Sequence, residues 1–282
     1  MKTRPFKQVD VFTNEPYLGN PVAVVLDGEG LSDEQMQTFA RWTNLSETTF
    51  VLRPDEAAAD YRVRIFTPGG ELPFAGHPTL GTCHAWLEAG GVPASRDQVV
   101  QQCAVGSVRV RRGNGPLAFA APSCNTGTPP PALLTKVAAA LGLKAQQIVA
   151  ARVLDNGPVW LGLLLDATQT VLGLDPDHLA LKNLGQKVGV AAVNATGDAA
   201  DPNLEVRAFA AAMGIPEDPV TGSLNASLAQ WLIEDGRMPE RYIAAQGQCL
   251  GRAGRVRIER DAAGQVWVGG DSVTCIDGTV TL

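Results

Sequence analysis

The amino-acid sequence predicts an α+β protein made of two similar halves, and three observations support this. A motif that joins a strand to a helix occurs twice, about half the chain apart. Short segments rich in β-branched and aromatic residues outnumber the helical patterns. The length of 282 residues suits one large or two medium domains, since domains commonly run to about 100–150 residues.

The repeated motif begins in a strand and ends at the start of a helix. The two copies read Val63-Arg64-Ile65-Phe66 then Glu71-Leu72-Pro73-Phe74-Ala75-Gly76-His77, and Val206-Arg207-Ala208-Phe209 then Glu217-Asp218-Pro219-Val220-Thr221-Gly222-Ser223. The Glu, Pro and Gly of the second copy each lie 146 positions after those of the first. A helical pattern follows each glycine, and glycine also ends it. Each copy therefore predicts a strand, a glycine-bearing turn and a helix.

The repeat extends upstream of the motif. Gly19-Asn20-Pro21-Val22 matches Asn156-Gly157-Pro158-Val159 as a turn that opens a strand, and Ser32-Asp33-Glu34 and Asp175-Pro176-Asp177 both start helices. A period near 140 residues is too long for a solenoid, whose units run to roughly 20–50 residues. We therefore predict two homologous domains that face each other across a pseudo-twofold axis.

The remaining elements follow from alternation, helical period and turn residues. Strands are predicted at 22–26, 48–53, 61–66, 98–102, 107–111, 117–120, 188–193, 256–259, 266–269 and 278–282. Helices are predicted at 32–42, 79–88, 132–141, 176–183, 222–234 and 239–242. Each half then forms a curved sheet filled by a helix.

A proline-rich stretch marks the predicted domain boundary. Residues 126–131, with three consecutive prolines, break both the strand and the helix period. We place an N-terminal domain at residues 1–125 and a C-terminal domain at 126–282. The sequence leaves open whether the last strand crosses back to complete the first domain's sheet.

Composition excludes several classes of protein. Residues 1–11 hold no apolar run of signal-sequence length, and no run of about 18 apolar residues occurs anywhere, so we expect a cytoplasmic protein with no membrane partner. The five cysteines are scattered without metal-binding spacing, which argues against structural disulfides and zinc. A net charge of −6 without a basic run argues against nucleic acid.

The two glycine-bearing helix starts predict an anion site. Backbone N–H groups at Gly76 and Gly222, with the positive end of each helix dipole, favour an anion by about 0.3–2 kcal/mol per contact. His77 and Ser223 occupy equivalent positions, and Asp218 lies in the turn before Ser223. If a twofold axis relates the helices, both starts point into one cleft suited to a small carboxylate. The structural alternative is that His77 and Ser223 only cap their helices.

Glu47 is the candidate for proton transfer. It lies between a helix end and a strand, in Asn44-Leu45-Ser46-Glu47-Thr48, and burial there would raise its pKa as a general base requires. The matching stretch of the second half, 189–192, holds no carboxylate. The alternative is a solvated loop glutamate.

These strings resemble the phenazine-biosynthesis PhzF-like family, relatives of diaminopimelate epimerase and proline racemase. The resemblance runs nearly end to end, through both turns, the Glu47 segment, both glycine motifs and Val268-Gly269-Gly270. It implies a diaminopimelate epimerase-like fold of two domains, each a strand barrel around a central helix. It also implies an active site between the domains, no cofactor and no metal, and a homodimer.

The resemblance also implies roles for individual residues. Glu47 matches the catalytic glutamate, which moves a proton between ring carbons of trans-2,3-dihydro-3-hydroxyanthranilate. His77, Asp218 and Ser223 match residues that hold or polarise the substrate, and Gly76 and Gly222 supply backbone donors. The racemase and epimerase relatives have two cysteines at the two helix starts, and this chain lacks them. Cys83 lies further along, well inside the helix that follows Gly76. The expected function is a cofactor-independent isomerase of a small carboxylic acid.

Two other functions stay open. Ser223, His77 and Asp218 are the residue types of a hydrolase triad, although Thr221-Gly222-Ser223-Leu224-Asn225 is not a Gly-x-Ser-x-Gly elbow. A non-catalytic small-acid binding or interaction module could retain the same residues. The side chains do not single out a dihydroanthranilate ring over another cyclic or amino acid.

Overall fold

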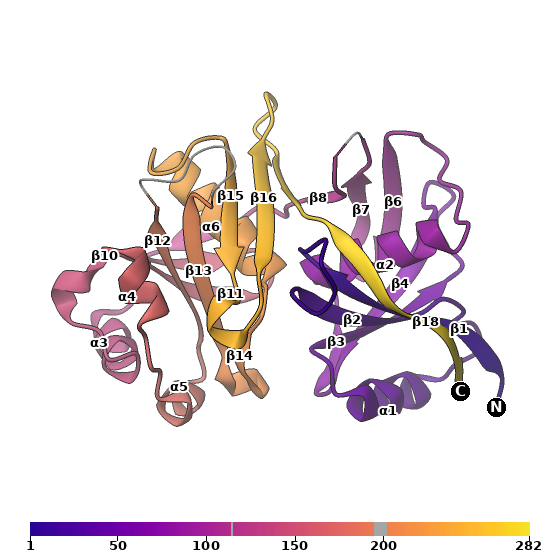
Figure 1. Cartoon of the computed structure of the whole chain (residues 1–282), viewed down its shortest axis with the longest axis horizontal. Helices are drawn as coiled ribbons and strands as arrows, with labels where there is room; N and C mark the ends of the chain where they lie inside the picture. Colours follow the sequence, from indigo (N-terminus) through magenta and orange to yellow (C-terminus); the bar gives the residue numbers. More distant parts are fainter. Residues whose placement is uncertain (114, 195–201) are drawn as a thin grey trace. The chain divides into compact units, whose positions relative to one another are not determined.

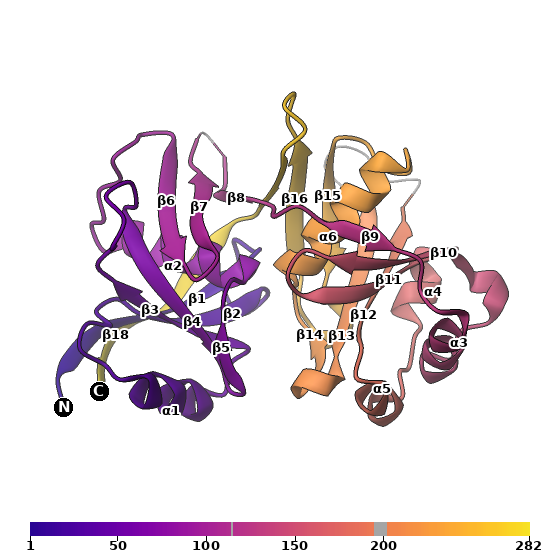
Figure 2. The same cartoon turned by 180° about the vertical axis from the view of Figure 1, so that it is seen from behind.

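The computed structural model describes residues 1–113, 115–194 and 202–282, in two compact units (Figures 1 and 2). Unit 1 comprises Met1–Ala120 and Gly269–Leu282, and unit 2 comprises Ala121–Val268. The division therefore lies between residues 120 and 121, not between 125 and 126. Residues after 120 belong to unit 2 because Ala121 N donates to Val266 O and Cys124 N donates to the Gln230 side chain. The proline-rich stretch instead opens a helix, with Pro131 in its first turn.

The two ends of the chain complete one sheet in unit 1. Strand β18 (Ser272–Thr281) pairs antiparallel with β1 (Thr3–Val11), from Thr3 opposite Thr281 to Val11 opposite Ser272. Both termini therefore lie together in Figure 1. Sequence analysis did not predict β1, because polar residues interrupt its apolar positions. Arg4, Lys7 and Asp10 are nonetheless buried in the structure.

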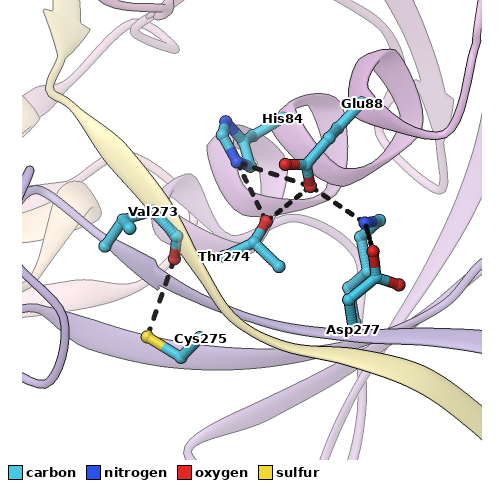
Figure 3. A network of polar contacts seen from close by, with 7 residues as sticks. His84, Glu88, Val273, Thr274, Cys275 and Asp277 are labelled. Atoms are coloured by element: carbon cyan, nitrogen blue, oxygen red, sulfur yellow. Dashed lines mark hydrogen bonds and ion pairs between the residues drawn. The ribbon is translucent and has the colours of Figure 1, made fainter.

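A polar network joins β18 to the last turn of the central helix of unit 1 (Figure 3). Glu88 Oε2 accepts a hydrogen bond from Thr274 Oγ1 at 2.6 Å and lies 3.0 Å from Lys7 Nζ. Lys7 also pairs with Asp277 at 2.7 Å, and His84 Nε2 lies 3.1 Å from the Thr274 hydroxyl. The network attaches the C-terminal strand to both β1 and the helix.

The strands of unit 1 surround a buried helix. The other strands are β2 (Asn20–Val25), β3 (Glu47–Leu52), β4 (Tyr61–Thr67), β5 (Gly70–Leu72), β6 (Gln98–Cys103), β7 (Gly106–Arg111) and β8 (Ala118–Ala120). Helix α2 (Gly76–Glu88) contacts β1, β2, β3, β6, β8 and β18. Gly81 permits the close approach, since a Cβ there would lie 2.4 Å from Val22 Cγ1. Helix α1 (Asp33–Thr43) starts with a capping box between Ser32 and Gln35 and packs outside the strands, beside β3 and β4.

Unit 2 repeats this arrangement around helix α6 (Gly222–Glu234), most of whose residues are buried. Its strands are β9 (Asn125–Gly127), β10 (Ile148–Asp155), β11 (Val159–Leu165), β12 (Lys187–Val193), β13 (Leu204–Ala210), β14 (Ile215–Asp218), β15 (Arg241–Gln246), β16 (Gly254–Arg260) and β17 (Val266–Gly269). Helices α3 (Pro131–Ala140), α4 (Thr168–Leu172) and α5 (His178–Leu184) enclose a second apolar cluster with β11 and β12. Short 3-10 helices lie at Ala145–Gln147, Ala211–Met213 and Gln248–Leu250 in the described part of this unit.

The strand pairings of the two units match in order and direction. In unit 1, β2 and β3 are parallel, β3–β4 and β4–β5 antiparallel, β4–β6 parallel and β6–β7 antiparallel. In unit 2, β11–β12, β12–β13, β13–β14, β13–β15 and β15–β16 repeat these directions. The predicted α+β class with two pseudo-symmetric halves is confirmed.

One local prediction was wrong and one helix was missed. Residues 239–242 form no helix, and strand β15 begins at Arg241, because Tyr242 and Ala244 alternate with more exposed neighbours against β16. Helix α4 was not predicted, since its five residues are too few to show a helical period. No helix in the described ranges is long and apolar enough to cross a membrane.

Candidate functional site

The repeated Arg and Glu of the motif form the same ion pair in both units. Arg64 donates from Nε and Nη2 to the two carboxylate oxygens of Glu71, at 2.8 and 2.6 Å. Arg207 does the same to Glu217, at 2.9 Å for both bonds. Each guanidinium also lies over the phenylalanine two residues later, with Cζ 5.0 and 5.1 Å from the ring centroid. The motif glutamates therefore tie the turn to the strand before it, which fixes where each helix begins.

The helices after these turns start without side-chain caps. The N-cap residues are Ala75 for α2 and Thr221 for α6, and neither side chain bonds to its helix's first turn. His77 and Ser223 lie inside the helices, and their side chains contact other groups instead. The capping role that sequence analysis left open for these two residues is therefore wrong. Helix starts of this kind favour an anion.

In unit 1 the structure brings Glu47 and His77 together. Glu47 is the first residue of β3, and its Oε2 lies 3.4 Å from His77 Nε2. Their side chains are 13% and 5% exposed, respectively. Glu47 is therefore a half-buried strand residue rather than a solvated loop glutamate.

His77 is neutral at neutral pH. Burial lowers its pKa to about 3, against a smaller opposing effect of the Pro21 backbone. The Asn20 amide Nδ2 lies 3.4 Å from His77 Nδ1. The bond to the Pro21 backbone comes from a ring N–H, because that carbonyl oxygen can only accept, and His77 Nε2 faces Glu47.

In unit 2 the structure holds Ser223 at two atoms. Trp160 Nε1 donates to Ser223 Oγ at 3.2 Å, and Asn156 Nδ2 donates to the Ser223 carbonyl oxygen at 2.9 Å. Asp218 ends β14, and its Oδ2 accepts a hydrogen bond of 2.6 Å from Thr221 Oγ1. The serine and the aspartate thus flank the first turn of α6.

Gln246 joins this turn to β15. Its Nε2 donates to the Asp218 carbonyl oxygen and to Thr221 Oγ1, at 3.0 and 2.9 Å. Its Oε1 accepts from Thr221 N at 3.0 Å and from Asn225 Nδ2 at 2.9 Å. Every polar atom of the Gln246 side chain is thus used to fix the turn that carries Asp218.

Sequence analysis missed several of these supporting residues, although the repeat contained a signal for two of them. Asn20 and Asn156 both belong to the repeated turn, and each contacts the residue after a motif glycine. Trp160 and Gln246 had no such signal, because their contacts depend on strand register.

Strand register also corrects the equivalence proposed for Glu47. Thr48 pairs with Phe66 in unit 1, as Val188 pairs with Phe209 in unit 2. The unit 2 counterpart of Glu47 is therefore Lys187, just before the stretch 189–192 that sequence analysis matched to it. The two units thus carry opposite charges at equivalent positions.

The predicted residues assemble within their own units: Gly76, His77 and Glu47 in unit 1, and Asp218, Gly222 and Ser223 in unit 2. In the described ranges, no three His, Cys, Asp or Glu side chains are grouped as metal ligands.

Comparison with known proteins agrees with this architecture. A PhzF family protein from Bacillus anthracis has the same fold, with a TM-score of 0.86 at 24% identity and complete coverage of both chains. The chain belongs to the phenazine biosynthesis-like protein family (PhzC-PhzF), whose sequence model matches residues 9–278.

Two curated relatives are similar over nearly their whole length. The trans-2,3-dihydro-3-hydroxyanthranilate isomerase of Pseudomonas aeruginosa is 36% identical, over 97% of this chain and 98% of its own. "Antisense-enhancing sequence 1" of Schizosaccharomyces pombe is 34% identical, over 99% of both chains. The names of the family and its relatives indicate an isomerase or epimerase.

Proposed function

We propose that the protein is an isomerase of a small cyclic carboxylic acid, and that Glu47 transfers the proton by general acid–base catalysis without a cofactor. The observation that carries the proposal is the contact between Glu47 and a buried, neutral His77, 3.4 Å apart. A carboxylate shielded from water is a stronger base than one in solution. A neutral imidazole adds no positive charge beside the carboxylate, as a protonated histidine would.

The chemistry divides between proton transfer and substrate binding. Glu47 takes a proton from one ring carbon and returns it to another, so the reaction needs no redox partner and no leaving group. His77 lies against the carboxylate, with Nε2 3.4 Å from Oε2. Ser223, Asp218 and the backbone groups at Gly76 and Gly222 are the proposed substrate-binding groups, with a substrate carboxylate placed at a helix start.

The relative's name supplies the first substrate to test. The relative that shares 36% of its residues is named for trans-2,3-dihydro-3-hydroxyanthranilate, a ring acid of the proposed class. We expect the wild-type protein to convert it in deuterated water and to place deuterium on a product carbon.

The variant Glu47→Gln tests the role of the carboxylate. The amide keeps the shape but cannot accept a proton, so turnover should fall by at least about 10²–10⁴-fold, the usual contribution of one acid–base group. Binding of anthranilate, measured by calorimetry, should persist. Glu34→Gln is the control, because Glu34 is an exposed residue in the first turn of α1. Near-normal turnover of Glu47→Gln would overturn the proposal.

Two other functions have less support. A hydrolase would need Ser223 activated by a base, but its Oγ accepts from an indole N–H, which makes the oxygen less nucleophilic. A serine-directed covalent probe that labelled Ser223 would favour the hydrolase. A non-catalytic binding module does not require a carboxyl group beside a neutral imidazole. Such a module would incorporate no deuterium into the ligand.

A further inference from the structure

Trp160 makes a buried hydrogen bond to one of the substrate-binding residues. The residue is 3% exposed and lies on β11, and its Nε1 lies 3.2 Å from Ser223 Oγ. An indole N–H is only a donor, so the direction of this bond is fixed: tryptophan donates and the serine oxygen accepts. The bond therefore uses acceptor capacity of the hydroxyl and leaves its hydrogen available.

The serine hydrogen has no acceptor in the part of the chain that the structure describes. The contacts of Ser223 there are the Trp160 bond to Oγ and the Asn156 bond to its carbonyl oxygen. A half-buried hydroxyl with a donor on its oxygen is thus oriented to donate. The group it suits is a hydrogen-bond acceptor, such as a carboxylate or carbonyl oxygen.

The tryptophan is held firmly enough to orient the serine. It pairs with Leu154 on β10 and with Lys187 on β12, so its strand is bonded on both sides. The Lys187 ammonium lies 5.8 Å from the indole centroid, within cation–π range. The same β10–β11 hairpin supplies Asn156, so one rigid element grips Ser223 at two atoms.

The strand position of unit 1 that matches Trp160 holds Val22. Val22 pairs with Glu47, the first residue of β3, as Trp160 pairs with Lys187, the first residue of β12. A valine side chain cannot donate a hydrogen bond. The donor is therefore specific to the unit with the serine, and the shared fold does not require it.

We propose that Trp160 is a positioning residue that orients the Ser223 hydroxyl as a donor to an acceptor oxygen of the substrate, its carboxylate in the first instance. This inference rests on the proposed function. It gives a role to the Trp160 indole N–H, which donates to Ser223 in the first turn of α6.

The test compares two tryptophan variants. Trp160→Phe removes the N–H donor but keeps an aromatic ring in the core. Trp231→Phe is the matched control, because Trp231 is 2% exposed in the same unit and its N–H donates to Asp235 instead. Thermal unfolding of both variants establishes that they fold.

We expect Trp160→Phe to weaken binding rather than chemistry. The KM for trans-2,3-dihydro-3-hydroxyanthranilate and the Kd of anthranilate should rise about 3- to 10-fold, as for the loss of one oriented hydrogen bond. The kcat should stay within about twofold, and Trp231→Phe should change neither constant by more than about twofold. Aniline, which lacks the carboxylate, should not distinguish Trp160→Phe from the wild type.

A double-mutant cycle shows whether the effect passes through the serine. In the Ser223→Ala background, Trp160→Phe should add no further loss, because the hydroxyl it orients is gone. The indole N–H signal of Trp160 in a nitrogen-15 NMR spectrum should also move when Ser223 becomes alanine.

The outcomes separate this inference from the proposed function. If the wild type binds anthranilate but Trp160→Phe behaves like Trp231→Phe, or acts equally in the Ser223→Ala background, the inference is overturned alone. If the wild type neither turns over the dihydroanthranilate nor binds anthranilate, the proposed function fails and the inference fails with it.

Discussion

At the scale of single residues, burial decides which form of each group is present. His77 sits against Glu47 with 5% of its side chain exposed, and desolvation lowers its pKa to about 3. An exposed histidine titrates near 6.5. The neutral imidazole is therefore a property of the folded site. Folding becomes less favourable at any pH at which the histidine is protonated in the unfolded chain but not in the folded one.

The pH dependence of stability tests this neutral state. Between about pH 3 and 6.5 the unfolded state binds the extra proton, so the free energy of unfolding should fall as pH is lowered through this window, by at most about 1.4 kcal/mol per pH unit from this residue. In His77→Gln that contribution should vanish, which urea unfolding at pH 7 and pH 5 measures. Equal pH slopes in wild type and variant would contradict a buried neutral His77.

At the scale of elements, buried polar contacts fix strands and turns that apolar packing leaves undefined. The Arg–Glu pairs do this at both motif turns, and the network in Figure 3 does it for β18. Lys7 is 5% exposed and keeps its charge: burial disfavours the ammonium, but hydrogen bonds to Asp277 and Glu88 outweigh it and raise its pKa. A buried charge that loses its partners is costly.

Removing the counter-charges of Lys7 should therefore lower the free energy of unfolding more than removing the Lys7 charge itself. The double change Glu88→Gln and Asp277→Asn leaves the Lys7 ammonium without a counter-charge and should lower the free energy of unfolding by about 1–3 kcal/mol, a range that allows for the exposure of both carboxylates. Lys7→Met removes the buried charge and should cost less, since an apolar replacement of similar length is tolerated. Urea denaturation compares the two, and a greater loss in Lys7→Met would show that the ammonium is not the group at risk.

At the scale of the whole molecule, one strand–turn–helix pattern is used twice with different side chains. The matching strand pairings carry Glu47 in one unit and Lys187 in the other. The helices after the motif glycines carry His77 in one unit and Ser223 in the other. The shared scaffold thus carries different polar groups in the two units, so these groups are not a requirement of the fold.

Metal and cofactor independence is a prediction about the whole protein. Acid–base isomerisation through Glu47 needs no electron carrier, so turnover of trans-2,3-dihydro-3-hydroxyanthranilate should survive exhaustive dialysis against a chelator. Activity measured before and after dialysis, with Mg²⁺ and Zn²⁺ added back, checks this. Loss of activity that a divalent ion restores would rule out the cofactor-free mechanism.

The sequence by itself determined the repeat, the α+β class, most helices and strands, and the residues placed after each motif glycine. These depend on local patterns: helical period, strand alternation and turn glycines act over a few residues. It also identified Glu47 and His77 separately. It could not show that they lie 3.4 Å apart, because that contact joins β3 to α2.

Only the tertiary structure decided which distant segments pair. It assigned β18 to unit 1, moved the boundary to residue 120, and identified Lys187 as the counterpart of Glu47. It also placed Trp160 against Ser223, 63 positions away in the chain. The physical reason is that strand register and long-range hydrogen bonds depend on how whole elements pack, and a shift of one residue would turn every side chain of a strand to the opposite face.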